Sequence, residues 1–233
     1  MSVSSINPDK AILVSDFDGT MTAHDFYKLA VESLMPADVP DYWARYRDGT
    51  MTHFEALRAY FSSIQGSESE VLDVVRRMQL DEGVPAAVQR LKEAGWRVVI
   101  ASAGCEWYIR HLLGNSDVEI HANPGRFETG KGLLMEMPTG SLFASPTLGI
   151  NKAGVVRHYL NQGFVVAFAG DGFPDADPAI LVSDDLRFAR SDLADTLRSQ
   201  GFHFRSYQVW SDIADMLSKR YSIEATTSCT LPT

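Results

Sequence analysis

Three short apolar runs constrain the fold of this chain more than any other feature. They are AILVS at Ala11–Ser15, WRVVIAS at Trp96–Ser102 and FVVAFA at Phe164–Ala169. Apolar runs of this length are typical of strands that are buried on both faces of a parallel sheet. The second and third runs follow helix-like segments, VPAAVQRLKEAG and KAGVVRHYLNQG, which both close on a glycine. This order predicts a doubly wound α/β fold, with a parallel sheet between layers of helices.

Weaker patterns extend this core. The runs at Asp117–His121 and Ala179–Val182 are two further candidates for strands. Residues 124–150 are rich in Gly, Pro and Thr, and the segment FETGKGLLMEMP within them predicts a β-hairpin that turns at Thr129–Gly132.

Residues 21–83 break the alternation of helix and strand. They contain no strand-like run, and HFEALRAYFSSI and SEVLDVVRRMQL have helical patterns. We therefore predict a helical domain at 21–83 that is inserted into a discontinuous core of residues 1–20 and 84–221. The polar residues 222–233 are expected to form a flexible tail.

Composition excludes several classes of protein. A chain of 233 residues, 45% of them hydrophobic, supports one domain with a large insertion or two modest domains. The formal charge is −9 and no Lys/Arg run is present, unlike in nucleic-acid-binding proteins. No apolar stretch reaches the ~18 residues that suggest a membrane span, and the first residues do not resemble a signal peptide. We expect a cytoplasmic protein without nucleic-acid or membrane partners.

Polar side chains follow the three predicted strands directly. Asp16 and Asp18 lie in VSDFDGTMT, Ser102 lies in ASAG, and Asp171 and Asp175 lie in AGDGFPD. In open α/β sheets, ligands bind outside the carboxyl ends of the strands. We therefore expect these side chains to converge on one site.

The converging groups suit phosphoryl transfer. Carboxylates crowded in one cleft need a cation to stay ionised, and oxygen-only ligands favour Mg²⁺. One carboxylate can attack phosphorus and a second can move protons. Ser102, the backbone N–H groups of Ala103 and Gly104, and Lys152 are candidates to hold the phosphoryl oxygens. Taken singly, these residues are more typical of a turn, a helix cap and a surface lysine, so the prediction depends on their combination.

This combination resembles the four motifs of the haloacid-dehalogenase-like (HAD) superfamily. DFDGT, then a hydroxyl after the next strand, then Lys152, then GDGxxD occur in that order, and the resemblance covers about Ile12 to Leu217. It implies a Rossmann-like core with residues 21–83 as a helical type-1 cap. It also implies an enzyme that hydrolyses a small phosphorylated metabolite, with Mg²⁺ as cofactor and an aspartyl-phosphate intermediate.

The resemblance also implies a role for each motif residue. Asp16 would be the nucleophile and Asp18 the general acid/base. Ser102 and Lys152 would hold the phosphoryl group. The implied metal ligands are Asp16, the backbone carbonyl of Asp18, Asp171, and Asp175 as a ligand or a neighbour of the ligands.

Within the superfamily, the cap and GDGFPDAD are similar to the phosphoserine-phosphatase-like branch. That branch has an acidic residue nine positions after the nucleophile, here Asp25. Phosphoserine phosphatases also have a cap arginine that binds the serine carboxylate, whereas this chain places Tyr60 there and Arg58 two residues away. This departure does not favour phosphoserine as the substrate.

The 2-hydroxy-3-keto-5-methylthiopentenyl-1-phosphate phosphatases are more similar. The shared segments are the DFDGTxT opening, HANPGRFETGKGLLMEMP, FAR at Phe188–Arg190 and the stretch SYQVWSDIADML. However, the cysteine-rich stretch that these enzymes have before the motif lysine is missing before Lys152. The resemblance therefore indicates a branch of the superfamily rather than a substrate.

Cap residues are weaker candidates, and several questions stay open. Dehalogenases of the superfamily lack the second motif aspartate, so Asp18 argues against that reaction. A phosphotransferase or phosphomutase, and a catalytically silent phosphate-binding regulatory module, remain alternatives. The chain is expected to be a monomer or a homodimer. The candidate specificity residues are His24, Asp25, Arg45, Arg47, Arg58 and Tyr60.

Overall fold

A five-stranded parallel sheet lies at the centre of the molecule. The computed structural model describes residues 10–218. The strand order is β3-β2-β1-β8-β9, and every neighbouring pair is parallel. This arrangement confirms the predicted doubly wound α/β fold. The strands are β1 (Ala11–Ser15), β2 (Trp96–Cys105), β3 (Glu119–Asn123), β8 (Val165–Gly170) and β9 (Arg187–Ala189).

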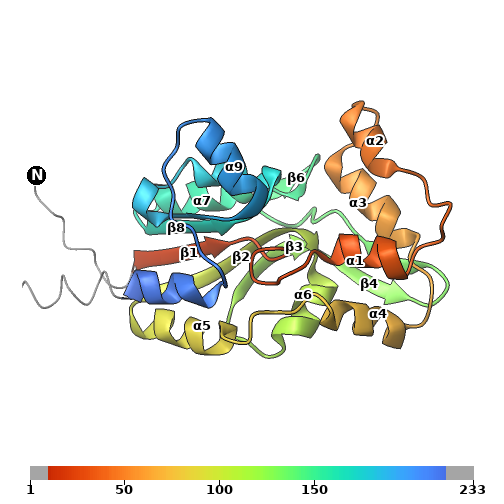
Figure 1. The fold of residues 1–233 in the computed structure, drawn as a ribbon, viewed down its shortest axis with the longest axis horizontal. Helices are drawn as coiled ribbons and strands as arrows, with labels where there is room; N and C mark the ends of the chain where they lie inside the picture. The colour runs from red at the N-terminus through yellow and green to blue at the C-terminus, as the bar shows by residue number, and fades with distance from the viewer. Residues whose placement is uncertain (1–9, 219–233) are drawn as a thin grey trace, which may run out of the picture.

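Helices cover both faces of this sheet (Figure 1). Alternate strand residues point to opposite faces, so Leu13 and Ile100 join one apolar cluster while Val14 and Val99 join the other. The first cluster is closed by α5 (Val84–Glu93), α6 (Glu106–Leu113) and a helical segment at 211–218. The second is closed by α7 (Lys152–Asn161), α8 (Ala176–Ala179) and α9 (Ser191–Ser199).

The predicted strand at Ala179–Val182 is wrong. Ala179 ends α8, and the fifth strand is β9, which begins at Arg187. Ala179 and Val182 join the second apolar cluster, whereas Ile180, the C-cap of α8, is exposed, so the run does not pair within the sheet. The strand β9 was not predicted because it begins with a charged residue, Arg187. Arg187 is buried, and its guanidinium donates to the carbonyls of Ala179 (2.7 Å) and Val182 (2.7 Å).

Residues 21–83 carry four helices, which lie beside the carboxyl ends of the strands (Figure 1). The segment leaves and rejoins the core at one place, because Thr22 and Leu80 form an antiparallel bridge. Capping boxes start two of the helices, at Thr52 and Ser67. The helices are α1 (Phe26–Ser33), α2 (Tyr42–Arg47), α3 (His53–Ser62) and α4 (Glu68–Arg76). We refer to residues 21–83 as the insertion.

The predicted hairpin is present and contacts the insertion. β4 (Gly125–Glu128) and β5 (Gly132–Met135) pair in antiparallel fashion. Gly132 lies against α3: a Cβ atom there would be 2.6 Å from the carbonyl oxygen of Phe61 and 2.9 Å from that of Ile64. A second ribbon, β6 (Ala144–Ser145) with β7 (Gly149–Ile150), leads into α7.

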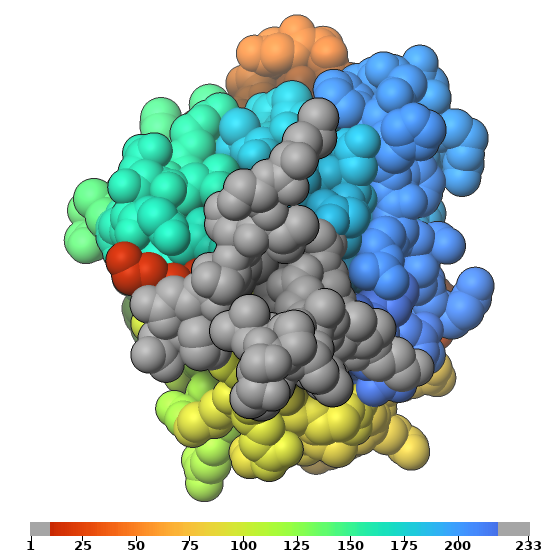
Figure 2. All heavy atoms as spheres, turned by 90° about the vertical axis from the view of Figure 1, so that its left-hand side faces the viewer, coloured from red at the N-terminus to blue at the C-terminus, as the bar shows by residue number. Residues whose placement is uncertain are grey.

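Figure 2 shows the end of the molecule that faces away from the insertion. Yellow atoms, which include α5, and blue C-terminal residues form much of this end, and orange atoms of the insertion appear at its top. Within residues 10–218, no helix has the length and apolar character needed to cross a membrane. The predicted tail at 222–233 lies outside the described residues.

Candidate active site

The carboxyl ends of β1 and β8 bring four aspartates to one edge of the sheet. The backbone N–H of Asp16 donates to the carbonyl of Ala169 at 2.9 Å, so the start of the β1 loop is held beside β8. After β8, a single 3-10 turn at Phe173–Asp175 returns Asp175 towards this edge. Asp16 and Asp175 are buried, and Asp171 is partly buried.

Lys152 is the central cation of this group. It is the first residue of α7 and is buried. Its Nζ lies 2.7 Å from Oδ1 of Asp16 and 2.7 Å from Oδ1 of Asp175. Burial alone would lower the pKa of Lys152, but the charges of Asp16 and Asp175 outweigh it and raise the pKa. The lysine is therefore charged and offsets part of the negative charge of the cluster.

Asp175 binds both Lys152 and the backbone of the loop that follows β8. While Oδ1 faces Lys152, Oδ2 accepts hydrogen bonds from the backbone N–H groups of Asp171 and Gly172, both at 3.1 Å. Both oxygens thus already have protein partners. This arrangement agrees with a residue that orients the neighbouring ligands and contributes to the cluster's charge.

Asp171 approaches the first loop closely. Its Oδ1 accepts from the hydroxyl of Thr20 at 3.0 Å. Gly19 adopts a positive φ of 68°, and a Cβ atom there would collide with Oδ2 of Asp171 and lie 2.8 Å from Oδ1 of Asp25. A glycine is required at this position because both the backbone conformation and the space exclude a side chain.

Asp16, Asp171 and Asp175 could together hold a hard metal ion. One carboxylate oxygen of each lies within 4.8 Å of the others. Burial, and then the charge of Asp175, raise the pKa of Asp16 well above its ordinary value. Burial and the charges of Asp175 and Asp25 raise the pKa of Asp171 to about 7. Oxygen-only donors and this concentration of negative charge fit Mg²⁺.

Asp18 is held by two donors from outside this cluster. Its Oδ1 accepts from the backbone N–H of Phe26 (3.1 Å), and its Oδ2 accepts from the hydroxyl of Tyr108 (2.8 Å). Burial, and then the charge of Asp25, raise the pKa of Asp18 to about 6, although both hydrogen bonds act in the opposite direction. A carboxyl group that titrates near neutral pH is suited to giving and taking protons.

The segment around Ser102 supplies neutral donors. The strand β2 does not end at Ser102, as the sequence suggested, but continues to Cys105. The Ser102 Oγ accepts from the N–H of Gly104 at 3.0 Å, which leaves its own hydrogen free to donate. The side-chain amide of Asn123 donates to the carbonyl of Ala103 at 2.7 Å and fixes the following peptide. Ser102, Ala103 and Gly104 all line the cavity next to Asp16.

That cavity has a volume of about 290 Å³ and lies between the sheet edge and the insertion. Its floor is formed by the aspartates, Ser102 and Lys152. Burial, and then the charge of Lys152, lower the pKa of His53 to about 4, so His53 is neutral at pH 7. The insertion contributes Asp25, Tyr27, Lys28, Trp43, His53, Leu57 and Phe61 to the wall. The size suits a small metabolite.

The structure brings only one of the candidate specificity residues into the cavity wall. Asp25 lines the cavity and forms an ion pair with Lys28. Tyr60 is buried among aromatic rings, and its hydroxyl donates to Asp41 at 3.3 Å. The other four are exposed side chains outside the wall: His24, Arg45, Arg47 and Arg58.

Sequence reasoning missed Thr20, Tyr108 and His53. Thr20 belongs to the quoted DFDGT motif, but its bond to Asp171 depends on the fold. Tyr108 lies in the first turns of the helix that follows the Ser102 loop, a position from which a side chain can reach the strand ends. The position of Tyr108 near the start of this helix could have predicted a contact with the strand ends. His53 carried no such signal, because only the packing of α2 and α3 brings it to the cavity.

Comparison with known sequences places the chain among hydrolases. The family model described as haloacid dehalogenase-like hydrolase matches residues 13–179. A phosphoserine phosphatase from Archaeoglobus fulgidus is 26% identical over 218 residues, covering 91% of this chain and 57% of the relative. A 2-hydroxy-3-keto-5-methylthiopentenyl-1-phosphate phosphatase from Bacillus pumilus is 22% identical over 213 residues, covering 88% of this chain and 89% of the relative. The chain therefore spans little more than half the length of the archaeal relative.

Solved structures share the fold. A HAD family hydrolase from Salmonella enterica serovar Typhi superposes with a TM-score of 0.67 at 15% identity, covering 91% of this chain and 73% of that one. A phosphoserine phosphatase from T. onnurineus gives a TM-score of 0.61 at 19% identity, covering 92% of this chain and 98% of that one. At these identities the likeness shows the fold alone.

Proposed function

Because the chain belongs to the haloacid dehalogenase-like hydrolases, we propose that it hydrolyses a small phosphomonoester through an aspartyl-phosphate, with Mg²⁺ as cofactor. The observation that carries this proposal is the position of Asp16. It lies at the floor of the cavity, beside the charged Lys152 and within 4.8 Å of carboxylate oxygens of Asp171 and Asp175. A nucleophile, a cation and a metal donor set thus meet at one point.

The proposed reaction has two steps. A carboxylate oxygen of Asp16 forms a bond to phosphorus while the bond from phosphorus to the substrate alcohol breaks, and Asp18 gives its proton to the departing oxygen. Water then attacks the phosphorus of the aspartyl-phosphate, Asp18 takes back a proton, and phosphate leaves with Asp16 regenerated. A pKa of about 6 lets Asp18 serve in both directions near neutral pH.

The other groups hold the phosphoryl oxygens and the metal. The hydroxyl of Ser102 and the N–H of Ala103 are the proposed neutral donors, and Lys152 is the proposed cation. The N–H of Gly104, a third candidate from the sequence, donates to the Oγ of Ser102. Mg²⁺ would be held by Asp16, Asp171, the backbone carbonyl of Asp18 and, directly or through its neighbours, Asp175. When bound, Mg²⁺ supplies positive charge that offsets the charge of the phosphoryl oxygens and the nucleophile.

The charged residues of the cavity wall indicate which substrates the cavity accepts. Among the described residues that line the cavity, the lysines are Lys28 and Lys152, both in ion pairs with carboxylates, and no arginine is present. A carboxylate on the substrate would therefore meet aspartates without an unpaired cation. We infer that phosphoserine is a poor substrate, although the archaeal relative is named for that activity.

Two other functions use the same site. A phosphotransferase or phosphomutase differs only in the acceptor, which would be an alcohol in place of water. A silent phosphate-binding module would use the donors around Ser102 without turnover. The proton-transfer environment of Asp18 favours hydrolysis over the silent module, because a binding module needs no second buried carboxyl group beside the cavity.

The decisive experiment measures phosphate release from 4-nitrophenyl phosphate with and without Mg²⁺. We expect metal-dependent release by the wild type and its loss in Asp16→Asn. Asp195→Asn, at a surface aspartate paired with Arg198, is the matched control and should retain activity. An inactive wild type, or full activity in Asp16→Asn, would contradict the proposal. Transfer of phosphate to an added alcohol in preference to water would instead identify a phosphotransferase.

The substrate is best sought by comparing kcat/KM across phosphorylated metabolites. The set includes phosphoserine, phosphocholine and sugar phosphates. We expect phosphoserine to be among the weakest, because its carboxylate lacks a partner in the cavity wall. A clear preference for phosphoserine would show that Lys28 leaves Asp25 to bind substrate.

A further inference from the structure

Tyr108 lines the cavity and bonds the proposed general acid directly. It lies in α6, its side chain is 1% exposed, and its hydroxyl donates to Oδ2 of Asp18 at 2.8 Å. The two residues are ninety positions apart in the sequence. A buried hydroxyl costs free energy unless it is hydrogen-bonded, so this bond is part of the reason that a tyrosine is accommodated here.

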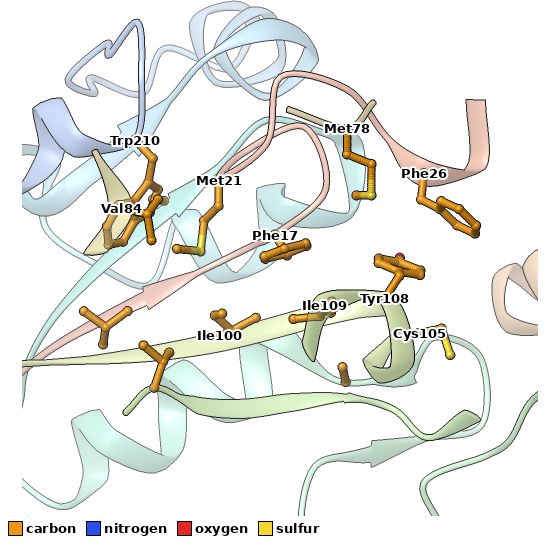
Figure 3. Close-up of a cluster of buried hydrophobic side chains, with 14 of the residues drawn as sticks. Phe17, Met21, Phe26, Met78, Val84, Ile100, Cys105, Tyr108, Ile109 and Trp210 are labelled. Atoms are coloured by element: carbon orange, nitrogen blue, oxygen red, sulfur yellow. The ribbon is translucent and has the colours of Figure 1, made fainter. Parts of the chain in front are cut away.

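Packing around the ring fixes where the hydroxyl points. The ring of Tyr108 lies 4.6 Å from that of Phe26 and meets that of Phe61 edge-on at 6.1 Å, measured between centroids. Figure 3 shows Tyr108 and Phe26 facing each other at one end of the apolar cluster. Neighbouring aromatic rings leave the tyrosine little freedom to rotate. The position of its oxygen is therefore set by the core rather than by solvent.

Gly104 leaves the space that this contact needs. A Cβ atom at position 104 would collide with Oη of Tyr108 and lie 2.9 Å from Oδ2 of Asp18. Any side chain there would separate the hydroxyl from the carboxyl group. Gly104 thus leaves room for the hydrogen bond between Tyr108 and Asp18, in addition to donating its N–H to Ser102.

The two donors to Asp18 fix the plane of its carboxyl group. Tyr108 binds Oδ2 from the core helix α6, and the N–H of Phe26 binds Oδ1 from the first residue of α1 in the insertion. With one donor on each oxygen, the group cannot turn about its Cβ–Cγ bond without losing a hydrogen bond. Proton transfer depends on such orientation, because the proton must lie within hydrogen-bond reach of the departing oxygen.

We propose that Tyr108 is a positioning residue that holds the carboxyl group of Asp18 for proton transfer to the leaving oxygen of the substrate. The inference rests on the proposed function, in which Asp18 is the general acid. It makes a specific claim about chemistry: Tyr108 matters most when the leaving oxygen is strongly basic and cannot depart without a proton.

The test uses two substrates that differ by one methylene. 4-Nitrophenyl phosphate releases a weakly basic phenolate, whereas 4-nitrobenzyl phosphate releases a strongly basic alkoxide that needs protonation. The quantity measured is kcat/KM, which reports the steps up to cleavage of the bond to the leaving group. In Tyr108→Phe we expect kcat/KM for the benzyl ester to fall about tenfold or more, while that for the phenyl ester falls at most about threefold.

The control is a second buried tyrosine that also bonds a carboxylate. The hydroxyl of Tyr159 donates to Glu119 at 3.0 Å, and neither residue lines the cavity. Tyr159→Phe should leave the ratio of the two kcat/KM values unchanged. Replacing Tyr108 with 4-aminophenylalanine, which restores a donor on the same ring, should return the ratio towards that of the wild type.

The ratio is measured on one preparation, so it does not depend on how much of a variant is folded. An unchanged ratio in Tyr108→Phe, with a wild type that is active on both esters, would overturn the role of Tyr108 alone. Failure of 4-aminophenylalanine to restore a lowered ratio would also overturn it, because the effect would then come from the ring environment. A wild type without activity on either ester would instead overturn the proposed function.

Discussion

The core and the insertion differ in how tightly they hold their polar groups. In the core, Lys152 lies between Asp16 and Asp175 with both ion pairs at 2.7 Å and all three side chains buried. In the insertion, Arg45 and Arg58 are exposed and lie outside the cavity wall. Polar chemistry is therefore concentrated at the sheet edge, whereas the insertion offers the cavity mainly aromatic and aliphatic surface.

The difference follows from burial. A charged group removed from water must find partners, and those partners then fix its position. An exposed charge gains little from any one arrangement, so nothing in the sequence fixes its direction. In the proposed function, the core would accordingly carry the reaction and the insertion would shape the space around the substrate. Four experiments test this contrast between the two regions.

The largest effect is expected from Lys152→Met, which keeps the aliphatic stem and removes the charge between two carboxylates. We expect kcat/KM for 4-nitrophenyl phosphate to fall about 10²–10³-fold. The matched control is Lys131→Met in the β4–β5 hairpin, where the exposed lysine pairs with Glu128 at 2.7 Å. It should stay within about twofold of wild type. Equal losses of kcat/KM in both variants would show that a buried lysine matters no more for activity than an exposed one.

A second test concerns the pH dependence of stability in EDTA. Because the folded protein raises the pKa of Asp171 to about 7, the folded state binds this proton more tightly than the unfolded state does. The stabilisation is complete below the unfolded pKa and is lost as the pH rises through about 7. Wild type should lose on the order of 3 kcal/mol relative to Asp171→Asn between pH 4 and pH 7.

Urea unfolding at each pH gives the free energies for this comparison. The variant removes one titrating carboxyl group and keeps the side-chain size, so groups remote from Asp171 cancel in the difference. Asp16 does not cancel, because the charge of Asp171 contributes to its raised pKa. If the free energy of unfolding changed with pH in the same way for both proteins, the pKa of Asp171 would not be raised by its neighbours in the folded state.

His53 should give a smaller effect of opposite sign. Burial lowers its pKa to about 4, so its stabilisation is present above the unfolded pKa of ~6.5 and is lost as the pH falls through about 4. Between pH 6.5 and pH 4, wild type should lose about 2 kcal/mol relative to His53→Leu. His111→Leu, at an exposed histidine, is the control and should follow the wild-type profile. If the difference in free energy of unfolding between wild type and His53→Leu did not change with pH, His53 would be solvated in the folded protein.

The smallest effects are expected at the exposed arginines of the insertion. Arg45→Ala, Arg47→Ala and Arg58→Ala should each change kcat/KM by no more than about twofold, since none lines the cavity. Steady-state kinetics on the preferred substrate provides the measurement. A tenfold rise in KM for any of them would mean that the insertion turns that arginine towards bound substrate, which would restore the specificity role suggested by the sequence.

The sequence predicted the sheet well where strands are apolar throughout. β1 and β8 occur within one residue of the expected ranges, because a short run without polar residues fits a strand buried on both faces and does not fit a surface element. β9 was missed since its first residue, Arg187, is charged, and burial of that guanidinium depends on the carbonyls of Ala179 and Val182, which the fold brings to it. Side-chain pairing of this kind is not visible before the chain is folded.

Some residues of the site were likewise predicted from the sequence and others were missed. The proximity of Asp16 and Asp171 followed from the rule that parallel strands end together, and the structure places a carboxylate oxygen of each within 4.8 Å of the other. Lys152, at the start of a helix, was predicted from the resemblance, and the structure places it in contact with Asp16. Tyr108 was missed because tyrosine in a helix is ordinarily a packing residue, and its bond to Asp18 depends on the glycine at 104. Motifs predict which strand ends meet, whereas the orientation of each group depends on neighbours from elsewhere in the chain.

The bridge between Thr22 and Leu80 has a consequence for how such a chain can diverge. Since the insertion leaves and re-enters the core at adjacent positions, it can be lengthened, shortened or exchanged without moving β1 or α5. Closing a loop whose ends are already neighbours costs little entropy, and a different length changes that cost slowly. New alcohol groups can therefore be accommodated by changing the part of this segment beyond Phe26, whose N–H holds Asp18, while the carboxylates that would carry the chemistry keep their places.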